Sequence, residues 1–336
     1  MRSPRHGSSG SQPSLGHRGE RRTHSLRAIH TEHQHPLITE APMSVTALGY
    51  LVIETRQPEE WHDLLATTMG LHHSASDGPM KHYQLDEWQR RLSVIAGDEE
   101  RIAAVGWQVP DEPALASIKQ RLEQAGVETS EATHEECGIR ACSGMFSFID
   151  PISSMPTEIF YGPSISQLPF QPSASISGYE TGELGLGHVV YFIEDYAAGH
   201  RFYTEVLGFK ISDRIVWDGG EKDATFYHCN PRHHSLAIMP PFGDIPPGTF
   251  NHLMLQTKCI NDVGIIYDRV RAQQLPIMMH LGKHTNDYTE SFYLISPSGF
   301  GLEIGCNSRI ITPDWDVKVY DAPMIWGHEQ PGTYSA

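Results

Sequence analysis

Positive charge is scarce in this sequence of 336 residues, in which 25 Lys and Arg stand against 41 Asp and Glu for a formal net charge of −16. Nucleic-acid binding needs clustered Lys and Arg near the phosphates, so we expect no nucleic-acid partner. Long hydrophobic runs are missing too, because no apolar stretch approaches the roughly 20 residues that a membrane helix requires. We therefore expect no membrane partner.

Cysteine is also sparse, and the five cysteines include no CxxC pair. An odd number of cysteines without a short secreted framework is typical of a reducing compartment. The chain has no charged start followed by an apolar stretch, which is the pattern of a secretion signal. We expect a cytoplasmic protein. Cys229 and Cys306 are expected to be packing residues, because no base partner is evident beside either thiol.

The chain divides by composition into a tail, two domains and a linker. Hydrophobic residues make up 39% of the sequence, enough for two cores. Residues 1–42 are rich in Arg, Ser, His and Gly, so we expect a disordered tail whose six histidines hold no functional site. Residues 43–162 and 179–336 are predicted to be folded domains, and residues 163–178, rich in Pro and Ser, are predicted to link them.

The two halves repeat the same order of predicted elements. The hydrophobic periodicity predicts strands over Val45–Glu54 and Leu184–Glu194, and helices over Pro58–Met69, Ala114–Ala125, Tyr196–Leu207 and Asn261–Gln274. The pattern recurs after about 140 residues. It predicts an α+β fold made of four βαβββ modules, two in each half.

Three residues of the second half, His188, His252 and Glu303, have the chemistry of metal ligands. Each lies in a predicted strand and is expected to point to one face of a sheet. Two imidazoles and one carboxylate leave other coordination positions open, which is typical of non-haem Fe(II) oxygenases. Zinc or manganese would also accept these ligands. The sequence therefore predicts one divalent metal, with Fe(II) favoured and Mn(II) as the alternative.

The first half offers an internal comparison for this triad. Aligned by pattern, Tyr50 stands where His188 stands, Trp107 or a neighbour stands where His252 stands, and Glu158 matches Glu303. Only the glutamate keeps a ligand type. We therefore expect the N-terminal domain to lack the metal and the C-terminal domain to be the active one.

Two polar clusters lie between the predicted ligands. Residues 226–236 read FYHCNPRHHSL, and residues 282–293 read GKHTNDYTESFY. Adjacent residues of a strand face opposite sides, so only one of His233 and His234 is expected to point into a site on the sheet. A polar surface loop would explain either cluster alone, but it explains both poorly when a metal triad accompanies them.

The segments HTNDYTESFYLISPSGFGLE (284–303) and CNPRHHS (229–235) make the chain resemble a known family. From Met43 onward it is similar to type I extradiol catechol dioxygenases of the vicinal oxygen chelate superfamily, including 2,3-dihydroxybiphenyl 1,2-dioxygenases. Ser296 departs mildly from the pattern, because an acidic residue, an amide or Thr is more usual before that proline. Residues 151–158 are one residue longer than the family's usual loop.

The resemblance implies a reaction and a role for each site residue. It implies Fe(II)-dependent ring cleavage of a bicyclic or substituted catechol by O2, carried out by a homo-oligomer in aromatic compound degradation. It implies that the iron ligands are His188, His252 and Glu303 and that His234 is an acid/base residue. It also implies that His284 and Tyr293 contact the catechol hydroxyls, that Asn286 and Asp287 support them, and that Phe226 forms part of the pocket wall.

Other functions remain open at this point. The same paired-module fold carries glyoxalases and epimerases, which use a related metal site without oxygen chemistry, and metal-free members that bind aromatic ligands. The glyoxalase- and epimerase-like enzymes would not need the two polar clusters, and the intact metal triad counts against an aromatic-ligand binding protein. Locally, Asn286 and Asp287 have a structural alternative as residues that cap a turn.

Overall fold

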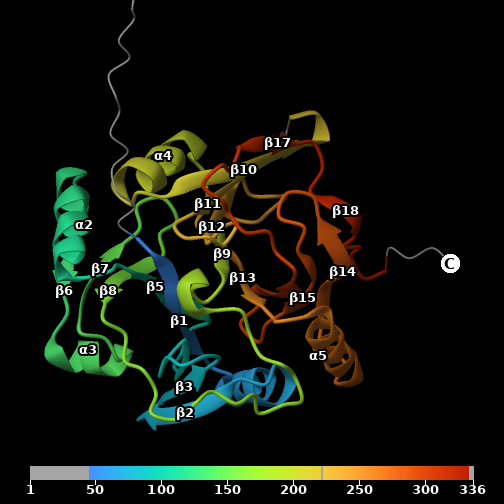
Figure 1. Ribbon diagram of the computed structural model, residues 1–336, viewed down its shortest axis with the longest axis horizontal. Coiled ribbons are helices and arrows are strands. Elements are labelled where there is room, and N and C mark those ends of the chain that lie inside the picture. Colours follow the sequence, from blue (N-terminus) through green and yellow to red (C-terminus); the bar gives the residue numbers. More distant parts are fainter. Residues whose placement is uncertain (1–44, 221, 333–336) are drawn as a thin grey trace, which may run out of the picture. The chain divides into compact units, whose positions relative to one another are not determined.

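The computed structural model describes residues 45–220 and 222–332 (Figure 1). The predicted tail, residues 1–42, lies outside the described residues, as do Met43 and the last four residues of the predicted C-terminal domain. The boundaries predicted around the linker at residues 163–178 stay a prediction. None of the described helices has the length and apolar character needed to cross a bilayer.

The strands of the first half form one mixed sheet with the order β2-β3-β4-β1-β5-β8-β7-β6. Its strands are β1 (Ala47–Thr55), β2 (His72–Asp77), β3 (Met80–Gln84), β4 (Leu92–Ala96), β5 (Arg101–Gln108), β6 (Ser130–Glu131), β7 (Gly144–Ile149) and β8 (Pro156–Tyr161).

The strands of the second half form another sheet with the order β17-β10-β11-β12-β9-β13-β16-β15-β14-β18. Its strands are β9 (His188–Phe192), β10 (Lys210–Trp217), β11 (Lys222–His228), β12 (Leu236–Met239), β13 (Phe250–Gln256), β14 (Ile277–His284), β15 (Glu290–Ile295), β16 (Gly301–Cys306), β17 (Lys318–Tyr320) and β18 (Met324–Gly327). The two C-terminal strands, β17 and β18, lie at opposite edges of this sheet.

Strand pairing confirms the predicted βαβββ modules and the α+β class. In every module the first strand pairs in parallel with the last, as in β1 with β4, β5 with β8, β9 with β12 and β13 with β16. The first strands of neighbouring modules pair antiparallel, β1 with β5 and β9 with β13. Each sheet therefore has two modules joined at its centre, and β17 and β18 extend the second sheet beyond the repeat.

The helices follow the predicted positions with one difference in geometry. The helical segments are α1 (Pro58–His62), η1 (Asp63–Thr68), α2 (Glu112–Gln124), α3 (His134–Arg140), η2 (Gly182–Leu184), α4 (Tyr196–Arg201), η3 (Phe202–Val206), η4 (Asp218–Gly220) and α5 (Ile260–Ala272). The segments η1 and η3 are π-helical turns at equivalent places in the two halves. Sequence periodicity predicted continuous helices there, because one wider turn leaves the apolar pattern nearly unchanged.

Local signals explain where the longer helices begin. The Asp111 side chain accepts a hydrogen bond from the Ala114 N–H at the start of α2, as an N-cap residue does. The short helix α3, which the sequence analysis did not predict, begins with a capping box between Thr133 and Glu136. Ile118 and Leu122 of α2 are fully buried, which anchors this helix to the core.

Hydrogen bonds connect the two halves of the described chain. The Leu186 N–H donates to the Leu48 carbonyl over 2.7 Å. The Asn230 side chain donates to the Thr46 carbonyl over 2.9 Å, and the Trp61 indole donates to the Ser298 hydroxyl over 2.9 Å. These bonds tie β1 and the helix after it to the strands and loops of the second sheet.

Gly187 permits the close approach of β9 and β13, and its replacement tests their pairing. A Cβ atom at Gly187 would lie 1.8 Å from the Met254 carbonyl oxygen, a backbone atom that cannot move alone. We expect Gly187→Ala to lower the free energy of unfolding by about 2 kcal/mol, as overpacking does. Gly264→Ala in α5, where a Cβ would meet no atom within 4 Å, serves as the control and should be neutral or stabilising. Urea denaturation measures both, and equal behaviour of the two variants would contradict this reading.

Candidate metal centre and its pocket

The register of three adjacent strands brings the predicted metal ligands together. Met254 of β13 pairs with His188 of β9 on one side and with Glu303 of β16 on the other. His252 precedes Met254 by two residues, so its side chain leaves the same face of the sheet. The neighbouring residues Val189, Leu253 and Leu302 belong to the hydrophobic core. Alternation along each strand therefore places core residues on one face and the three candidate ligands on the other.

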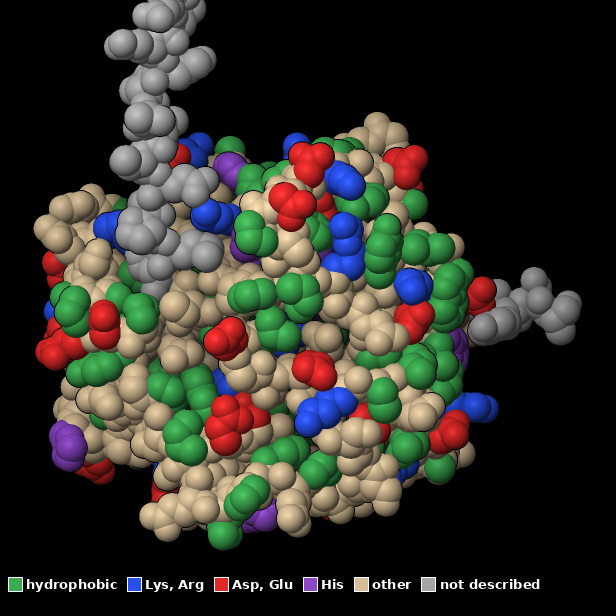
Figure 2. Space-filling view, in the orientation of Figure 1, with side chains coloured by type: hydrophobic (Ala, Val, Ile, Leu, Met, Phe, Trp, Pro, Cys, Tyr) green, Lys and Arg blue, Asp and Glu red, His purple; other side chains and the backbone are tan. Residues whose placement is uncertain are grey.

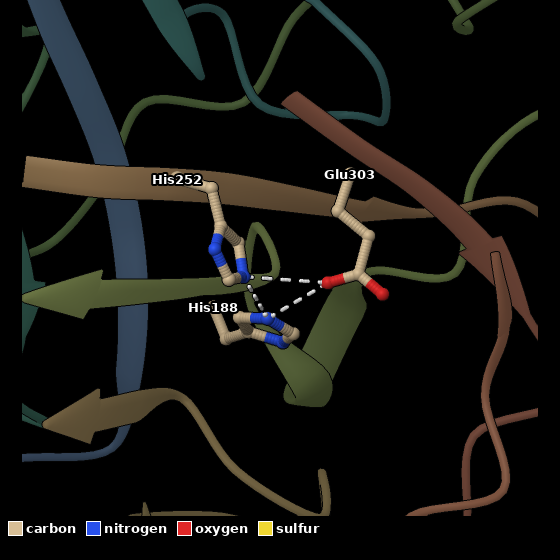
Figure 3. A group of neighbouring side chains, drawn as sticks. All are labelled: His188, His252 and Glu303. Atoms are coloured by element: carbon tan, nitrogen blue, oxygen red, sulfur yellow. Dashed lines mark hydrogen bonds and ion pairs between the residues drawn. The ribbon is translucent and has the colours of Figure 1, made fainter. Parts of the chain in front are cut away.

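The ligand atoms converge on one point (Figure 3). The Nε2 atoms of His188 and His252 lie 3.2 Å apart, and the Glu303 carboxylate oxygen Oε2 lies 3.2 Å from the first and 3.4 Å from the second. All three side chains are buried. Figure 3 shows the two imidazole edges and the carboxylate turned toward one another from three strands.

This arrangement fits a divalent metal ion. Ligand atoms about 2.1 Å from a metal and about 90° apart lie about 3 Å from one another, which is close to the observed separations. The Nδ1 atom of His252 lies 3.0 Å from the Asn251 side-chain oxygen, so Nδ1 carries the proton and the Nε2 lone pair points to the centre. Two nitrogen lone pairs and a carboxylate in one buried place repel one another unless a cation lies between them.

All nine predicted site residues line one cavity of about 350 Å³. The triad lies in it together with six further predicted residues, His234, Tyr293, His284, Phe226, Asn286 and Asp287. The structure thus brings together every residue that the sequence predicted for the site.

His234 stacks on a candidate ligand inside this cavity. Its ring centroid lies 3.9 Å from that of His188 and 4.9 Å from that of Phe226. Burial first, and then the proximity of His188, hold the pKa of His234 well below its ordinary value. His234 is therefore a neutral imidazole in this environment, able to accept a proton.

His233 points elsewhere, as predicted, but for a different reason. The two histidines lie in the loop before β12 and not in a strand, so strand alternation does not separate them. The Nε2 atom of His233 instead lies 2.8 Å from the buried Asp213 carboxylate, outside the cavity lining. A hydrogen-bonding partner, not strand geometry, sets its direction.

Tyr293 and His284 form a pair on the opposite wall. The Tyr293 hydroxyl lies 2.7 Å from His284 Nε2, while His284 Nδ1 lies 3.1 Å from the Pro323 carbonyl oxygen. Burial first, and then the Glu303 carboxylate, raise the pKa of Tyr293 well above its usual range. The phenol therefore keeps its proton and remains a hydrogen-bond donor.

Asn286 and Asp287 line the cavity, and Asp287 also stabilises a local turn. The Asp287 carboxylate accepts hydrogen bonds from the Thr289 N–H (3.0 Å) and the Thr289 hydroxyl (2.6 Å), which is the turn arrangement considered as the structural alternative. The Asn286 Nδ2 group is buried and has no hydrogen-bond partner among the described residues. Asn286 thus presents an unused donor beside the cavity.

Several cavity residues could not be found from sequence motifs. The apolar part of the wall consists of Val190, Ile215, Trp217, Ala224, Met239, Phe242, Met279, Pro323 and Met324. His328 also lines the cavity, with its ring centroid 4.3 Å from that of His284. Most of these residues carry no chemical signature, and His328 follows β18, outside the repeating modules. Only the three-dimensional path of the C-terminal segment brings it to the site.

The first sheet holds a different structure at the equivalent position. Tyr50 and Glu158 both pair with Gly106, as His188 and Glu303 both pair with Met254. Here the Tyr50 hydroxyl donates to Glu158, and the Arg140 guanidinium donates to both carboxylate oxygens over 2.7 and 2.8 Å. A protein cation therefore neutralises the buried carboxylate of the first half.

One predicted equivalence in the first half is wrong. Val52 pairs with Ala104 just as Val190 pairs with His252, so the residue matching His252 is Ala104 and not Trp107. Each pairing contains an irregularity that alignment by sequence pattern does not reveal. Trp107 instead packs in the core, with its ring 5.0 Å from Phe209.

A known protein family matches the half of the chain that contains the three candidate ligands, and related proteins match most of the chain. Residues 185–304 match the sequence profile of the Glyoxalase/Bleomycin resistance protein/Dioxygenase superfamily. The chain is 37% identical over 292 residues to the biphenyl-2,3-diol 1,2-dioxygenase of Paraburkholderia xenovorans, which covers 85% of this chain and 96% of that protein. It is 32% identical over 301 residues to an iron-dependent extradiol dioxygenase of Rhodococcus jostii, with 85% and 98% covered.

The fold comparison agrees with the sequence comparison. The crystal structure of a halotolerant catechol dioxygenase has a TM-score of 0.81 to this chain at 34% sequence identity. The superposition covers 86% of this chain and 96% of that one. The similarity therefore extends over both sheets and not only over the half that contains the triad.

Metal titration tests whether the triad is a metal site. We expect one Mn(II) or Fe(II) per chain, and Glu303→Gln should weaken metal binding at least about 100-fold, because even losing a residue that supports a ligand costs about 10–100-fold. The matched control is Glu158→Gln, which occupies the same register position in the first sheet and should keep the metal. Competition with a chelating dye, without oxygen, measures both. Equal metal loss in the two variants would rule out this assignment.

Proposed function

The chain belongs to the extradiol catechol dioxygenases of the vicinal oxygen chelate superfamily, and on that premise we propose that it uses Fe(II) and O2 to cleave the ring of a catechol bearing a second ring or another bulky substituent. The observation that carries the proposal is the placement of His188, His252 and Glu303 in the same cavity as His234 and Tyr293. Metal ligands, an imidazole base and a phenol donor together meet the needs of this reaction.

Iron is proposed as the metal because two imidazoles and one carboxylate on one face leave positions open for other ligands. When bound, Fe(II) would hold the two catechol oxygens beside O2 and relay electron density from the ring to oxygen. Mn(II) accepts the same donors, so the ligand set alone does not select between them. The relative in Rhodococcus jostii, which is iron-dependent by name, supports iron.

His234 is proposed as the acid/base residue. A catechol must lose a proton to become a good chelating ligand, and a neutral imidazole in the cavity can accept that proton. The stacked position of His234 on His188 keeps it beside the place where the diol would lie. The same imidazolium can later return the proton to oxygen when the O–O bond breaks.

Tyr293 and His284 are proposed to orient the diol. Tyr293 keeps its phenolic proton, so it can donate a hydrogen bond to the catechol oxygen that bears developing charge. Its contact with His284, and the contact of His284 with the Pro323 carbonyl, fix the direction of both side chains. Asn286 and Asp287 are proposed to support this wall, and Phe226 to pack against the ring.

The apolar part of the cavity favours a substrate with a second ring. Trp217, Phe242 and Met279 lie in the cavity wall together with the polar site residues. A volume of about 350 Å³ lies within the range of roughly 300–1,000 Å³ for small-molecule sites. The related Paraburkholderia enzyme acts on biphenyl-2,3-diol by name, which supports an aryl-substituted catechol here.

Oxygen uptake tests the proposed reaction. Protein reconstituted with Fe(II) without oxygen should consume one O2 for each 2,3-dihydroxybiphenyl and form a yellow product, with plain catechol turned over more slowly. Tyr293→Phe should lower kcat about 100-fold, as removal of one charge-stabilising donor does. The control Tyr288→Phe removes a hydroxyl from the half-exposed tyrosine of the same segment and should leave kcat unchanged.

The outcomes separate this function from others of the same fold. Absence of oxygen uptake across a panel of catechols, with one iron bound per chain, would overturn the dioxygenase assignment. A non-oxidative conversion of substrate would then favour an isomerase, and binding without conversion would favour an aromatic-ligand binding protein.

We further propose that the protein is a cytoplasmic homo-oligomer that associates through β18. Ile325 and Trp326 of this edge strand are 54% and 50% exposed, and Figure 2 shows apolar side chains gathered over this part of the face. Exposed apolar edge strands favour association. All five cysteines are free thiols, as a reducing compartment requires.

Sedimentation velocity tests the association. The native chain should sediment as an oligomer at micromolar concentration, and Trp326→Lys should shift it toward the monomer. Ile149→Glu changes an equally exposed apolar residue on the first sheet and should leave the oligomer intact. A monomeric native chain would disprove the proposal.

A further inference from the structure

His233 is buried beside the site and has no part in the mechanism proposed above. Its Nδ1 atom lies 3.1 Å from Nδ1 of His234, within hydrogen-bonding geometry, and its Nε2 atom lies 2.8 Å from Oδ2 of Asp213. His233 and Asp213 are 1% and 0% exposed. A continuous buried chain thus runs from a carboxylate on β10, through one imidazole, to the imidazole that lines the cavity.

The Asp213 carboxylate determines which atom donates in each hydrogen bond of this series. Asp213 Oδ1 accepts a hydrogen bond from the Lys318 N–H over 2.9 Å, and a carboxylate can only accept. The bond between Asp213 and His233 therefore requires the proton to be on Nε2 of His233. A neutral His233 then has a bare Nδ1, and this atom can only accept from Nδ1–H of His234.

We propose that Asp213 and His233 are positioning residues that fix the tautomer of His234, with the proton on Nδ1 and the lone pair on Nε2. This inference rests on the proposed function, because the acid/base task of His234 needs a bare nitrogen on the side of the ring away from His233. In a Ser-His-Asp triad, a buried carboxylate fixes the tautomer of the catalytic histidine in a similar way.

Asp287 is the competing partner for His234, and the geometry disfavours it. Its Oδ2 atom lies 3.9 Å from His234 Nδ1, beyond hydrogen-bonding distance. The same carboxylate already accepts two hydrogen bonds from Thr289. His233, Asp287 and His234 also form a group that could hold a metal, but Nδ1 of His233 cannot be both a ligand and the acceptor proposed here.

The C-terminal segment encloses this chain of hydrogen bonds. The Trp315 ring packs edge-on against His233 with centroids 5.3 Å apart, and its indole N–H donates to the Ser212 carbonyl over 2.9 Å. Strand β17, which supplies Lys318, pairs with β10 at Asp213, and Figure 1 shows these two strands side by side. Exclusion of water keeps the bonds between the three side chains strong.

Two substitutions at one position separate positioning from packing. His233→Gln leaves an amide oxygen that can accept from Nδ1–H of His234. His233→Phe fills the space and keeps an aromatic ring packed against Trp315, but it accepts no hydrogen bond. If His233 only packs, Phe should be tolerated at least as well as Gln. The inference predicts the reverse order.

Histidine ¹⁵N NMR on zinc-loaded protein reads the tautomer directly, because zinc is diamagnetic. The native chain should show His234 protonated at Nδ1 and His233 at Nε2, and His233→Phe should move the His234 proton to Nε2. In the iron-loaded enzyme, His233→Phe should lower kcat about 10–100-fold with the catechol KM changed less than about threefold. His233→Gln should recover most of the loss, and both variants should retain one iron per chain.

Three results would overturn the inference: His234 protonated at Nε2 in the native chain, a proton on Nδ1 of His233, or a second metal ion bound by His233, His234 and Asp287. If His233→Phe does not fold, Asp213→Asn gives the same test, because an amide cannot accept from both Lys318 and His233. The NMR result stands whether or not catechols are cleaved, so failure of the proposed function is distinguishable from failure of this inference.

Discussion

The site depends on one electrostatic constraint, which is the need to neutralise a buried carboxylate that faces two imidazole lone pairs. Glu303 is fully buried, and although burial alone would raise its pKa, the close approach of His188, His252 and His284 holds the pKa well below its ordinary value. An ionised carboxylate in such a place needs a cation or several donors. The strand register that builds the sheet also brings Glu303, His188 and His252 together, so the same pairing determines the fold and the candidate metal site.

The two halves surround their buried glutamate with different side chains. In the first sheet Arg140 lies against Glu158 and Tyr50 fills the space left by Gly106, so the carboxylate is satisfied within the protein. In the second sheet His188 and His252 occupy the positions of Tyr50 and Ala104, and their imidazoles carry lone pairs and no fixed charge. The repeated fold thus contains an internal salt bridge in one half and a candidate metal site in the other.

Much of the fold and of the candidate site could be predicted from sequence because the modules repeat and the candidate ligands lie in strands. His188, His252 and Glu303 stand in apolar segments whose alternation determines their face. The two π-helical turns, the short helix α3 and the match of His252 to Ala104 were not predictable, because they depend on register and hydrogen bonding and not on periodicity. Trp217, Phe242 and His328 reach the cavity from segments whose path depends on tertiary packing.

A crystal structure of the Fe(II)-loaded protein, grown without oxygen in the presence of 2,3-dihydroxybiphenyl, would test most directly whether this cavity holds iron and a catechol together. We expect one iron bound by His188 Nε2, His252 Nε2 and the Glu303 carboxylate, with the diol on the metal beside His234 and Tyr293, and the second ring against the apolar wall near Phe242. Iron bound elsewhere, or a diol lying away from the metal, would contradict this expectation.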